Sequence, residues 1–147
     1  MIGRYAVFAV AIAVVLGIGF WWTVPGRDDV SSTSDEPVST GAAIVAVAVP
    51  ETLSANAEIG KLAYDAKCAV CHGADAAGQD GAAPPLVHKI YEPSHHGEAA
   101  FLLAAKNGVR AHHWRFGNMP TVEGVTDGDV KMIVTYVREL QRANGIN

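Results

Sequence analysis

Two cysteines and a histidine stand within five residues of one another, in the sequence Cys-Ala-Val-Cys-His at residues 68–72. The two thiols are three residues apart, and the imidazole of His72 follows the second thiol directly. This spacing is typical of covalent haem attachment, in which each sulfur adds to one vinyl group as a thioether and the adjacent histidine binds the iron as proximal ligand. Cys68 and Cys71 are the only cysteines of the chain. The stretch therefore predicts one covalently attached haem c.

Three other roles of such a cysteine pair compete with haem attachment. A structural zinc site needs two more ligands at matching spacing, and the chain has no second cysteine pair. A thioredoxin-like redox pair lies in a strand–helix–strand context, whereas alanine-rich segments flank residues 68–72. A simple disulfide would give no role to His72. Haem attachment is favoured because it uses all three side chains.

Length and charge limit what else the chain can be. Its 147 residues, of which 50% are hydrophobic, allow one modest domain and a membrane segment. The formal net charge of -4 argues against a nucleic-acid partner, because phosphate binding needs a surplus of basic residues.

The amino-terminal segment, residues 1–24, is predicted to be an uncleaved transmembrane anchor. No charged side chain occurs from Tyr5 to Trp22, and the run approaches the roughly 20 residues that cross a bilayer core. Arg4 precedes it and a tryptophan pair closes it, which favours an amino terminus in the cytoplasm and the remaining chain outside. A cleaved signal peptide and a buried soluble helix are the alternatives, but the run ends without a small-residue cleavage site.

Residues 25–56 are interpreted as a flexible acidic and Ala/Val-rich linker. Its first half mixes Ser, Thr and Pro with four carboxylates and has no helical or strand periodicity. The apolar piece from Gly41 to Val49 is too short to span a membrane, and we expect extended chain that lies against the domain or a partner, or a small strand. A flexible linker of this length would average about 30 Å end to end.

Residues 57–147 are predicted to form an all-α domain. A first helix is expected over 57–68, with an apolar face made of Ile59, Leu62, Ala63 and Ala66. A second is expected over 97–106, ending at Asn107-Gly108. Thr126 and Asp129 form a capping-box pattern that begins the last helix, which ends at Asn144-Gly145. Its apolar residues repeat at helical spacing: Val130, Ile133, Val134, Val137 and Leu140.

Met119 is the candidate for the second axial ligand of the iron. It lies between Gly117 and Pro120 in a loop where regular structure does not explain an apolar side chain, whereas Met132 lies within the last helix and is expected to pack. A thioether is a soft ligand that raises the reduction potential. The pair His112-His113 is the alternative, and ligation by two histidines would lower the potential. His95 and His96 are interpreted as solvated surface, with a weak metal site as the alternative.

These motifs resemble the single-haem class I c-type cytochromes, in a membrane-anchored bacterial form. The resemblance covers residues 57–143 and rests on the 68–72 motif and the Met119-Pro120 pair. It implies a cytochrome c-like helical fold, with Gly60, Tyr64 and Tyr136 at a helix crossing. It also implies that the segment Pro84, Pro85 and Leu86 contacts the haem and supplies a proline carbonyl to the His72 ring.

The sequence departs from the better-known members of that family in two places. Mitochondrial-type members present a ring of lysines to their partners, whereas acidic and basic residues are nearly balanced in this domain. The tryptophan that binds a haem propionate in those proteins lies well before the methionine, whereas Trp114 is only five residues ahead of Met119. Trp114, Arg115 and His113 are candidate propionate contacts.

The expected function is single-electron transfer, without enzyme activity or a small-molecule substrate. Iron closed on both faces has no room for a substrate, and the redox chemistry belongs to the cofactor. The resemblance implies a donor such as a quinol-oxidising cytochrome bc complex and an acceptor such as a terminal oxidase or photosynthetic reaction centre. We expect a single-pass protein of a bacterial inner membrane with its haem domain in the periplasm. A fixed subunit of a larger redox complex, and a haem gas sensor or peroxidase, are the alternative functions.

Overall fold

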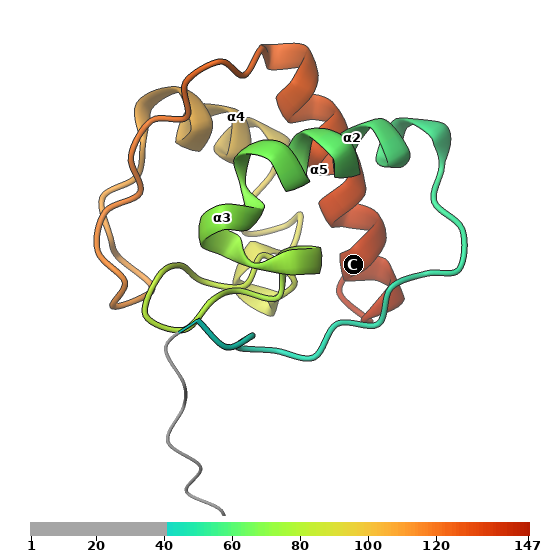
Figure 1. Ribbon diagram of the computed structural model, residues 1–147, viewed down its shortest axis with the longest axis horizontal. Helices are drawn as coiled ribbons and strands as arrows, with labels where there is room; N and C mark the ends of the chain where they lie inside the picture. Colours follow the sequence, from blue (N-terminus) through green and yellow to red (C-terminus); the bar gives the residue numbers. More distant parts are fainter. Residues whose placement is uncertain (1–40) are drawn as a thin grey trace, which may run out of the picture. The chain divides into compact units, whose positions relative to one another are not determined.

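The computed structural model describes residues 41–147, and the predicted anchor and the first half of the predicted linker lie outside these residues. Within this part of the chain, helix α2 (Ala55–Lys67) lies across helix α5 (Asp127–Ala143), and the remaining elements surround this pair (Figure 1). The short helix α3 (Ala69–His72) follows α2 almost directly. Two 3₁₀ turns, η1 (Ala74–Ala76) and η2 (Lys89–Tyr91), lead to helix α4 (Glu98–Asn107).

Helix α5 has the boundaries and the buried face that its sequence predicts. Thr126 accepts a hydrogen bond from the Asp129 amide, and the Asp129 carboxylate accepts one from the Thr126 amide at 2.9 Å, which completes the capping box. The five apolar residues predicted to repeat along this helix are all buried. The chain leaves the helix through Asn144 and Gly145, and Gly145 has a φ of 76°.

Helix α2 is present, but its buried face is not the predicted one. Ile59 and Leu62 are 54% and 72% exposed, and Ala66 is also exposed. The buried residues of α2 are instead Ala57, Gly60 and Tyr64. The reason is the close approach of α5 at Gly60, where the two backbones meet and leave no room for a side chain. The large aliphatic side chains of Ile59 and Leu62 point away from this contact. Of the four residues predicted for the apolar face, Ala63 is partly buried and packs against the core, whereas the prediction was wrong for Ile59, Leu62 and Ala66.

Gly60 is the point of closest approach between α2 and α5. A Cβ atom at Gly60 would overlap the carbonyl oxygen of Met132 on α5. One turn further on, the rings of Tyr64 and Tyr136 pack with centroids 5.6 Å apart. The helix crossing implied by the family resemblance at these residues is confirmed.

The hydroxyl groups of the two tyrosines bind the chain that follows α3. Tyr64 donates to the carbonyl of Gly73 at 2.8 Å, and Tyr136 donates to the Asp75 carboxylate at 2.9 Å. Asp75 has a φ of 51°, in a left-handed conformation that is uncommon for a residue with a side chain. The crossing of α2 and α5 thus also fixes the backbone beside His72.

The second half of the predicted linker is held against the domain. The amides of Ile44 and Val45 both donate to the Ala77 carbonyl at 3.1 Å, and the side chain of Asn144 makes two hydrogen bonds of 2.9 Å with the backbone of Ala48. Ser54 is bonded to the Glu139 carboxylate. In Figure 1 this segment, residues 41–54, runs past the end of α5 before it enters α2. Residues 41–49 are thus extended chain that lies against the domain, as one of the expectations for this apolar piece had it, because their backbone groups find partners there.

The all-α prediction for the domain is confirmed. The residues after 41 contain helices, 3₁₀ turns and two isolated antiparallel bridges, Gln79 with Ala83 and Val109 with Met119. None of the helices found in the 41–147 range has the length and hydropathy of a membrane span.

Candidate functional site

The predicted site residues come together around one cavity of about 690 Å³. Cys68, Cys71 and His72 line it from the end of α2 and from α3, and Met119 lines it from the loop between α4 and α5. About fifty residues of sequence separate the two groups, and the cavity lies between them. Two parts of the chain that carry ligand chemistry therefore face one space.

The two cysteines are free thiols, and they differ in environment. Cys68 is half-buried and Cys71 is exposed. Burial, together with the nearby Cys71, raises the pKa of the Cys68 thiol to about 11. Helix α3 begins directly after Cys68, whose carbonyl accepts hydrogen bonds from the amides of Cys71 and His72. This single turn places both thiols and the imidazole at the same cavity.

The His72 ring is held in one tautomer. Its Nδ1 lies 2.8 Å from the Pro84 carbonyl oxygen, which can only accept, so Nδ1 carries the proton and donates. Nε2 is then left with its lone pair. Burial lowers the pKa of His72, against the smaller opposing effect of the Pro84 hydrogen bond. A neutral imidazole with a free Nε2 is the form that binds a metal ion.

Met119 is fixed by backbone pairing with the start of its own loop. Its amide and carbonyl bond to the carbonyl and amide of Val109, each at 2.9 Å. Gly108, which ends α4, has a φ of 72°, and a Cβ there would lie 2.5 Å from the Met119 carbonyl oxygen. The end of α4 therefore determines where the thioether lies.

Trp114 is half-buried at the cavity, and its Nε1–H is buried and unsatisfied. Among the described residues, Nε1 is the one buried side-chain nitrogen or oxygen without a hydrogen-bond partner. Its ring lies edge-on to His88 at 5.0 Å and stacks with Phe116 at 6.0 Å between centroids. Burial raises the pKa of the Tyr91 hydroxyl, and the nearby Trp114 N–H opposes this rise. The two groups do not form a hydrogen bond of normal geometry. An acceptor on a bound group would satisfy this donor.

Two of the residues predicted to contact the cofactor do not line the cavity. Pro85 is fully buried and packs against Gly78 on the side of the segment away from it, and Arg115 is exposed. Pro84, Leu86 and Trp114 do line the cavity. In each of the pairs Pro84-Pro85 and Trp114-Arg115, only the first residue lines the cavity. Pro85 and Arg115 are therefore no longer candidates for contact with the cofactor.

Two buried polar residues of α5 support the segment beside the site. Apart from their positions on the buried face of the helix, no sequence motif indicates them. Gln141 is fully buried and donates to the carbonyls of Leu86 and Tyr91 at 2.8 and 3.0 Å. Arg138 donates to the carbonyls of Tyr91 and His96. Burial lowers the pKa of Arg138, although the nearby Glu98 opposes this. Together they hold residues 86–96 in place.

The histidines other than His72 and His88 gather near the same cavity. His96, His112 and His113 line it, and the His95 ring packs edge-on against His96 and at a tilt against His113. Partial desolvation, followed by the neighbouring histidines, lowers the pKa of His113. The interpretation of His95 and His96 as solvated surface agrees with the exposure of His95, whereas His96 is half-buried and lines the cavity. The sequence did not indicate that His113 lies beside them.

The residues present fit a covalently attached haem. The cavity volume lies in the range of cofactor sites, two thiols lie at one side, and a neutral imidazole has its Nε2 free. A thioether faces the same space, and the unsatisfied Trp114 N–H offers a donor for a carboxylate. Each feature matches a different part of the cofactor: its vinyl groups, its iron and its propionates.

Comparison with known protein families gives one finding. The family model described as Cytochrome c matches residues 57–141, which is more than half of the chain. Neither the curated proteins nor the solved structures gave a significant match.

Proposed function

The chain belongs to the cytochrome c family, and on that premise we propose that it is a membrane-tethered carrier of single electrons between redox complexes. Membership of the family implies a covalently bound haem c and redox protein partners. The observation that carries the proposal is the common cavity of Cys68, Cys71, His72 and Met119. Haem c, when bound, supplies the one-electron exchange between ferric and ferrous iron.

We assign the two thioether bonds to Cys68 and Cys71 and the proximal iron ligand to His72. The Pro84 carbonyl orients the His72 ring and leaves Nε2 for the iron. Met119 is assigned as the distal ligand, which its backbone pairing with Val109 supports. A soft, neutral thioether stabilises the ferrous state and keeps other molecules from the iron. This arrangement suits electron transfer and disfavours substrate chemistry.

Partner docking at the mouth of the cavity is supported by exposed apolar side chains. Val70, between the two cysteines, is 74% exposed, and Leu103, which lines the cavity, is 57% exposed. Large apolar residues exposed beside a site favour contact with another protein. We propose a quinol-oxidising complex of the cytochrome bc type as donor and a terminal oxidase or reaction centre as acceptor.

The tether and the location of the protein are proposed from the sequence. The uncharged run from Tyr5 to Trp22 supports a single span of a bacterial inner membrane, with the haem domain in the periplasm. Replacing residues 1–24 by a cleavable secretion signal should release a haem-loaded protein into the soluble periplasmic fraction. Retention of that protein in washed membranes would contradict the anchor.

The test of the proposed function is the visible spectrum of the haem-loaded protein, ferric and ferrous, before and after addition of carbon monoxide. A methionine-to-ferric-iron band and a ferrous spectrum that carbon monoxide leaves unchanged are expected. Met119→Ala should lose the band, bind carbon monoxide and lower the reduction potential. Met132→Leu is the matched control, because Met132 lies on α5 and does not line the cavity.

Two outcomes would contradict these assignments. If Met119→Ala kept the wild-type spectrum, the distal ligand would be a histidine, and His112 and His113 line the same cavity. Rapid carbon monoxide binding by the wild-type protein would favour gas sensing or peroxidase chemistry over simple electron transfer.

A fixed subunit of a larger redox complex is the second candidate function, and the exposed residues Val70 and Leu103 favour protein contact in that case too. Residues 41–49, for which contact with a partner was one expectation, instead make hydrogen bonds with their own domain. Extraction in mild detergent separates the candidates, since a carrier should be recovered as a free protein and a subunit with its complex.

A further inference from the structure

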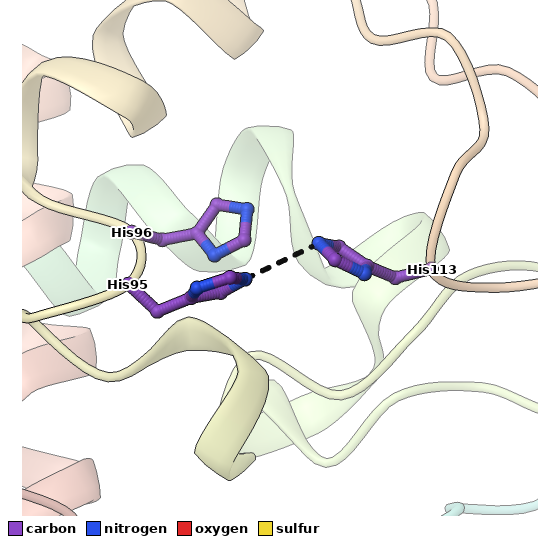
Figure 2. Close-up of side chains that lie close together, drawn as sticks. All are labelled: His95, His96 and His113. Atoms are coloured by element: carbon purple, nitrogen blue, oxygen red, sulfur yellow. Dashed lines mark hydrogen bonds between the residues drawn. The ribbon is translucent and has the colours of Figure 1, made fainter.

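Three imidazoles from two separate segments converge beside the haem cavity. His95 and His96 lie in the turn that precedes α4, and His113 lies in the loop that follows it. One ligand-capable nitrogen from each ring lies within 4.8 Å of the other two. Figure 2 shows the rings turned toward one another across the gap between the two segments.

The spacing of two of these rings suits a shared cation better than a direct hydrogen bond. Nε2 of His95 and Nε2 of His113 are 3.5 Å apart, a length at which a hydrogen bond is weak. Two nitrogen ligands on one tetrahedral zinc ion, each about 2.0–2.1 Å from the metal, are separated by about 3.3 Å. The separation of the two nitrogens is therefore close to that of two ligands of one ion.

The third ring is oriented by the backbone. His96 Nδ1 lies 2.7 Å from the Ile90 carbonyl oxygen, so Nδ1 is the donor and Nε2 keeps its lone pair. Arg138 in turn donates to the His96 carbonyl. A hydrogen bond from the second ring nitrogen to a carbonyl is the usual support of a metal-binding histidine. One ligand is thus held in place, and the exposed His95 and His113 can adjust around it.

The geometry points to a site for a divalent transition-metal cation of the Zn²⁺ class, bound by His95, His96 and His113. Imidazole nitrogens select such ions, whereas Ca²⁺ and Mg²⁺ prefer oxygen ligands. His112 can complete the coordination in place of water, because its ring lies 4.2 Å from that of His113. Its Nδ1 lies 2.8 Å from the Arg110 carbonyl, which leaves Nε2 free in this ring too.

The cation would lie next to the electron-transfer site, and this second step rests on the proposed function. His96 and His113 both line the cavity that we assign to the haem. Added positive charge beside a redox centre opposes the loss of an electron from it. Bound Zn²⁺ should therefore raise the reduction potential, so that the cation regulates the driving force for electron transfer.

Calorimetric titration of the untagged, haem-loaded full chain with Zn²⁺ tests the binding site. We expect one Zn²⁺ per chain, with the dissociation constant raised at least about tenfold in His95→Gln and in His113→Gln, and no measurable site in the double variant. Both residues are exposed, so the domain should fold in each variant. The ferric visible spectrum of each variant is recorded as well, because His113 lines the haem cavity; His95 does not line it, and His95→Gln should keep the wild-type spectrum.

His88→Asn is the matched control. It removes a histidine outside the cluster, and the Asn side-chain oxygen can replace the His88 Nδ1 that accepts from the Ile90 amide. Zn²⁺ binding should be the same as in the wild type. Equal Zn²⁺ affinity in the wild type and in the double variant would overturn the proposed site, as would a loss of affinity in His88→Asn equal to that in His95→Gln.

The effect on the haem is measured separately, from the reduction potential with and without Zn²⁺. A rise in the wild type that is missing in the double variant is expected. An unchanged potential in zinc-loaded wild type would overturn the regulatory step. Because Zn²⁺ binding is read by calorimetry and axial ligation by the spectrum, failure of the Met119 assignment and failure of the zinc site give different results.

Discussion

At the scale of single residues, the site depends on which nitrogen of His72 carries a proton. The Pro84 carbonyl holds the proton on Nδ1, and burial keeps the ring neutral by lowering its pKa. Both effects are needed. Without the Pro84 hydrogen bond, a neutral ring could carry its proton on Nε2, and a charged ring could not bind iron because neither nitrogen would have a free lone pair. Together they prepare Nε2 as a ligand before the iron arrives.

Trp114→Phe tests the unsatisfied donor at the cavity. Phenylalanine keeps a ring against His88 and Phe116 but lacks the N–H. If that N–H stabilises an ionised haem propionate, its loss should raise the propionate pKa and lower the reduction potential at neutral pH by a few tens of millivolts, about 1 kcal/mol. The measurement is the potential as a function of pH.

Tyr91→Phe is the control for this substitution, because the Tyr91 hydroxyl lies near the Trp114 N–H. It should leave the potential close to that of the wild type. Equal shifts of the potential in the two variants would indicate that the Trp114 N–H donates to Tyr91 and not to a haem propionate.

At the scale of elements, the crossing of α2 and α5 is sensitive to one missing side chain. Gly60→Ala would place a Cβ atom on the Met132 carbonyl oxygen and force the helices apart. We expect a loss of about 1–3 kcal/mol in the free energy of unfolding. Denaturant titration followed by circular dichroism measures it.

Gly128→Ala is the matched control, since it is the same change on the partner helix. The nearest atom to a Cβ there is Thr126 Oγ1 at 3.5 Å, an ordinary contact. Alanine is the better helix former, so this variant should be unchanged or up to about 1 kcal/mol more stable. Similar losses in both variants would mean that glycine flexibility, rather than close packing, explains Gly60.

The capping box of α5 should make part of the stability depend on pH. Hydrogen bonds from Thr126 lower the pKa of Asp129 below its usual 3.8, so the folded state favours the ionised carboxylate. This contribution is complete above the usual pKa and is lost as the pH falls through the lowered one. The wild type should therefore have a higher melting temperature than Asp129→Asn at pH 7, and the difference should shrink as the pH falls below the usual pKa of 3.8. A difference that stays constant over this range would contradict a role for the ionised form.

At the scale of the whole molecule, residues 41–54 belong to the domain that carries the candidate site. The segment is bonded to Ala77, to Asn144 and to Glu139, which lie in different parts of the domain. Its position therefore depends on contacts with residues distant in sequence.

Asn144→Ala should loosen this segment without changing the haem site. The variant loses two hydrogen bonds to Ala48, and the amides of Ile44 and Val45, which bond to Ala77, should exchange with solvent about tenfold faster. Hydrogen exchange measures this, and the visible spectrum should be unchanged. Asn147→Ala, the same change at the exposed last residue, is the control. Equal exchange in both variants would show that Asn144 does not hold the segment.

The local features of the fold and of the site could be predicted from the sequence alone. The 68–72 motif sets thiols and imidazole on one turn whatever the rest of the chain does, and the capping box with its periodic apolar residues defined α5 from Thr126 to Asn144. The family model at residues 57–141 agrees with these signals. Local spacing is enough here because hydrogen bonds within one turn, and one face of one helix, involve only neighbours in sequence.

Tertiary structure decided whatever depends on a partner distant in sequence. The buried face of α2 follows from α5 rather than from its own apolar residues, and residues 41–54 are held by groups that come later in the chain. Likewise, His95 and His113 are 18 residues apart in sequence, and the tertiary structure brings their Nε2 atoms to 3.5 Å from each other. Burial and ligand geometry are properties of contacts between segments, and the sequence pattern of one segment does not contain them.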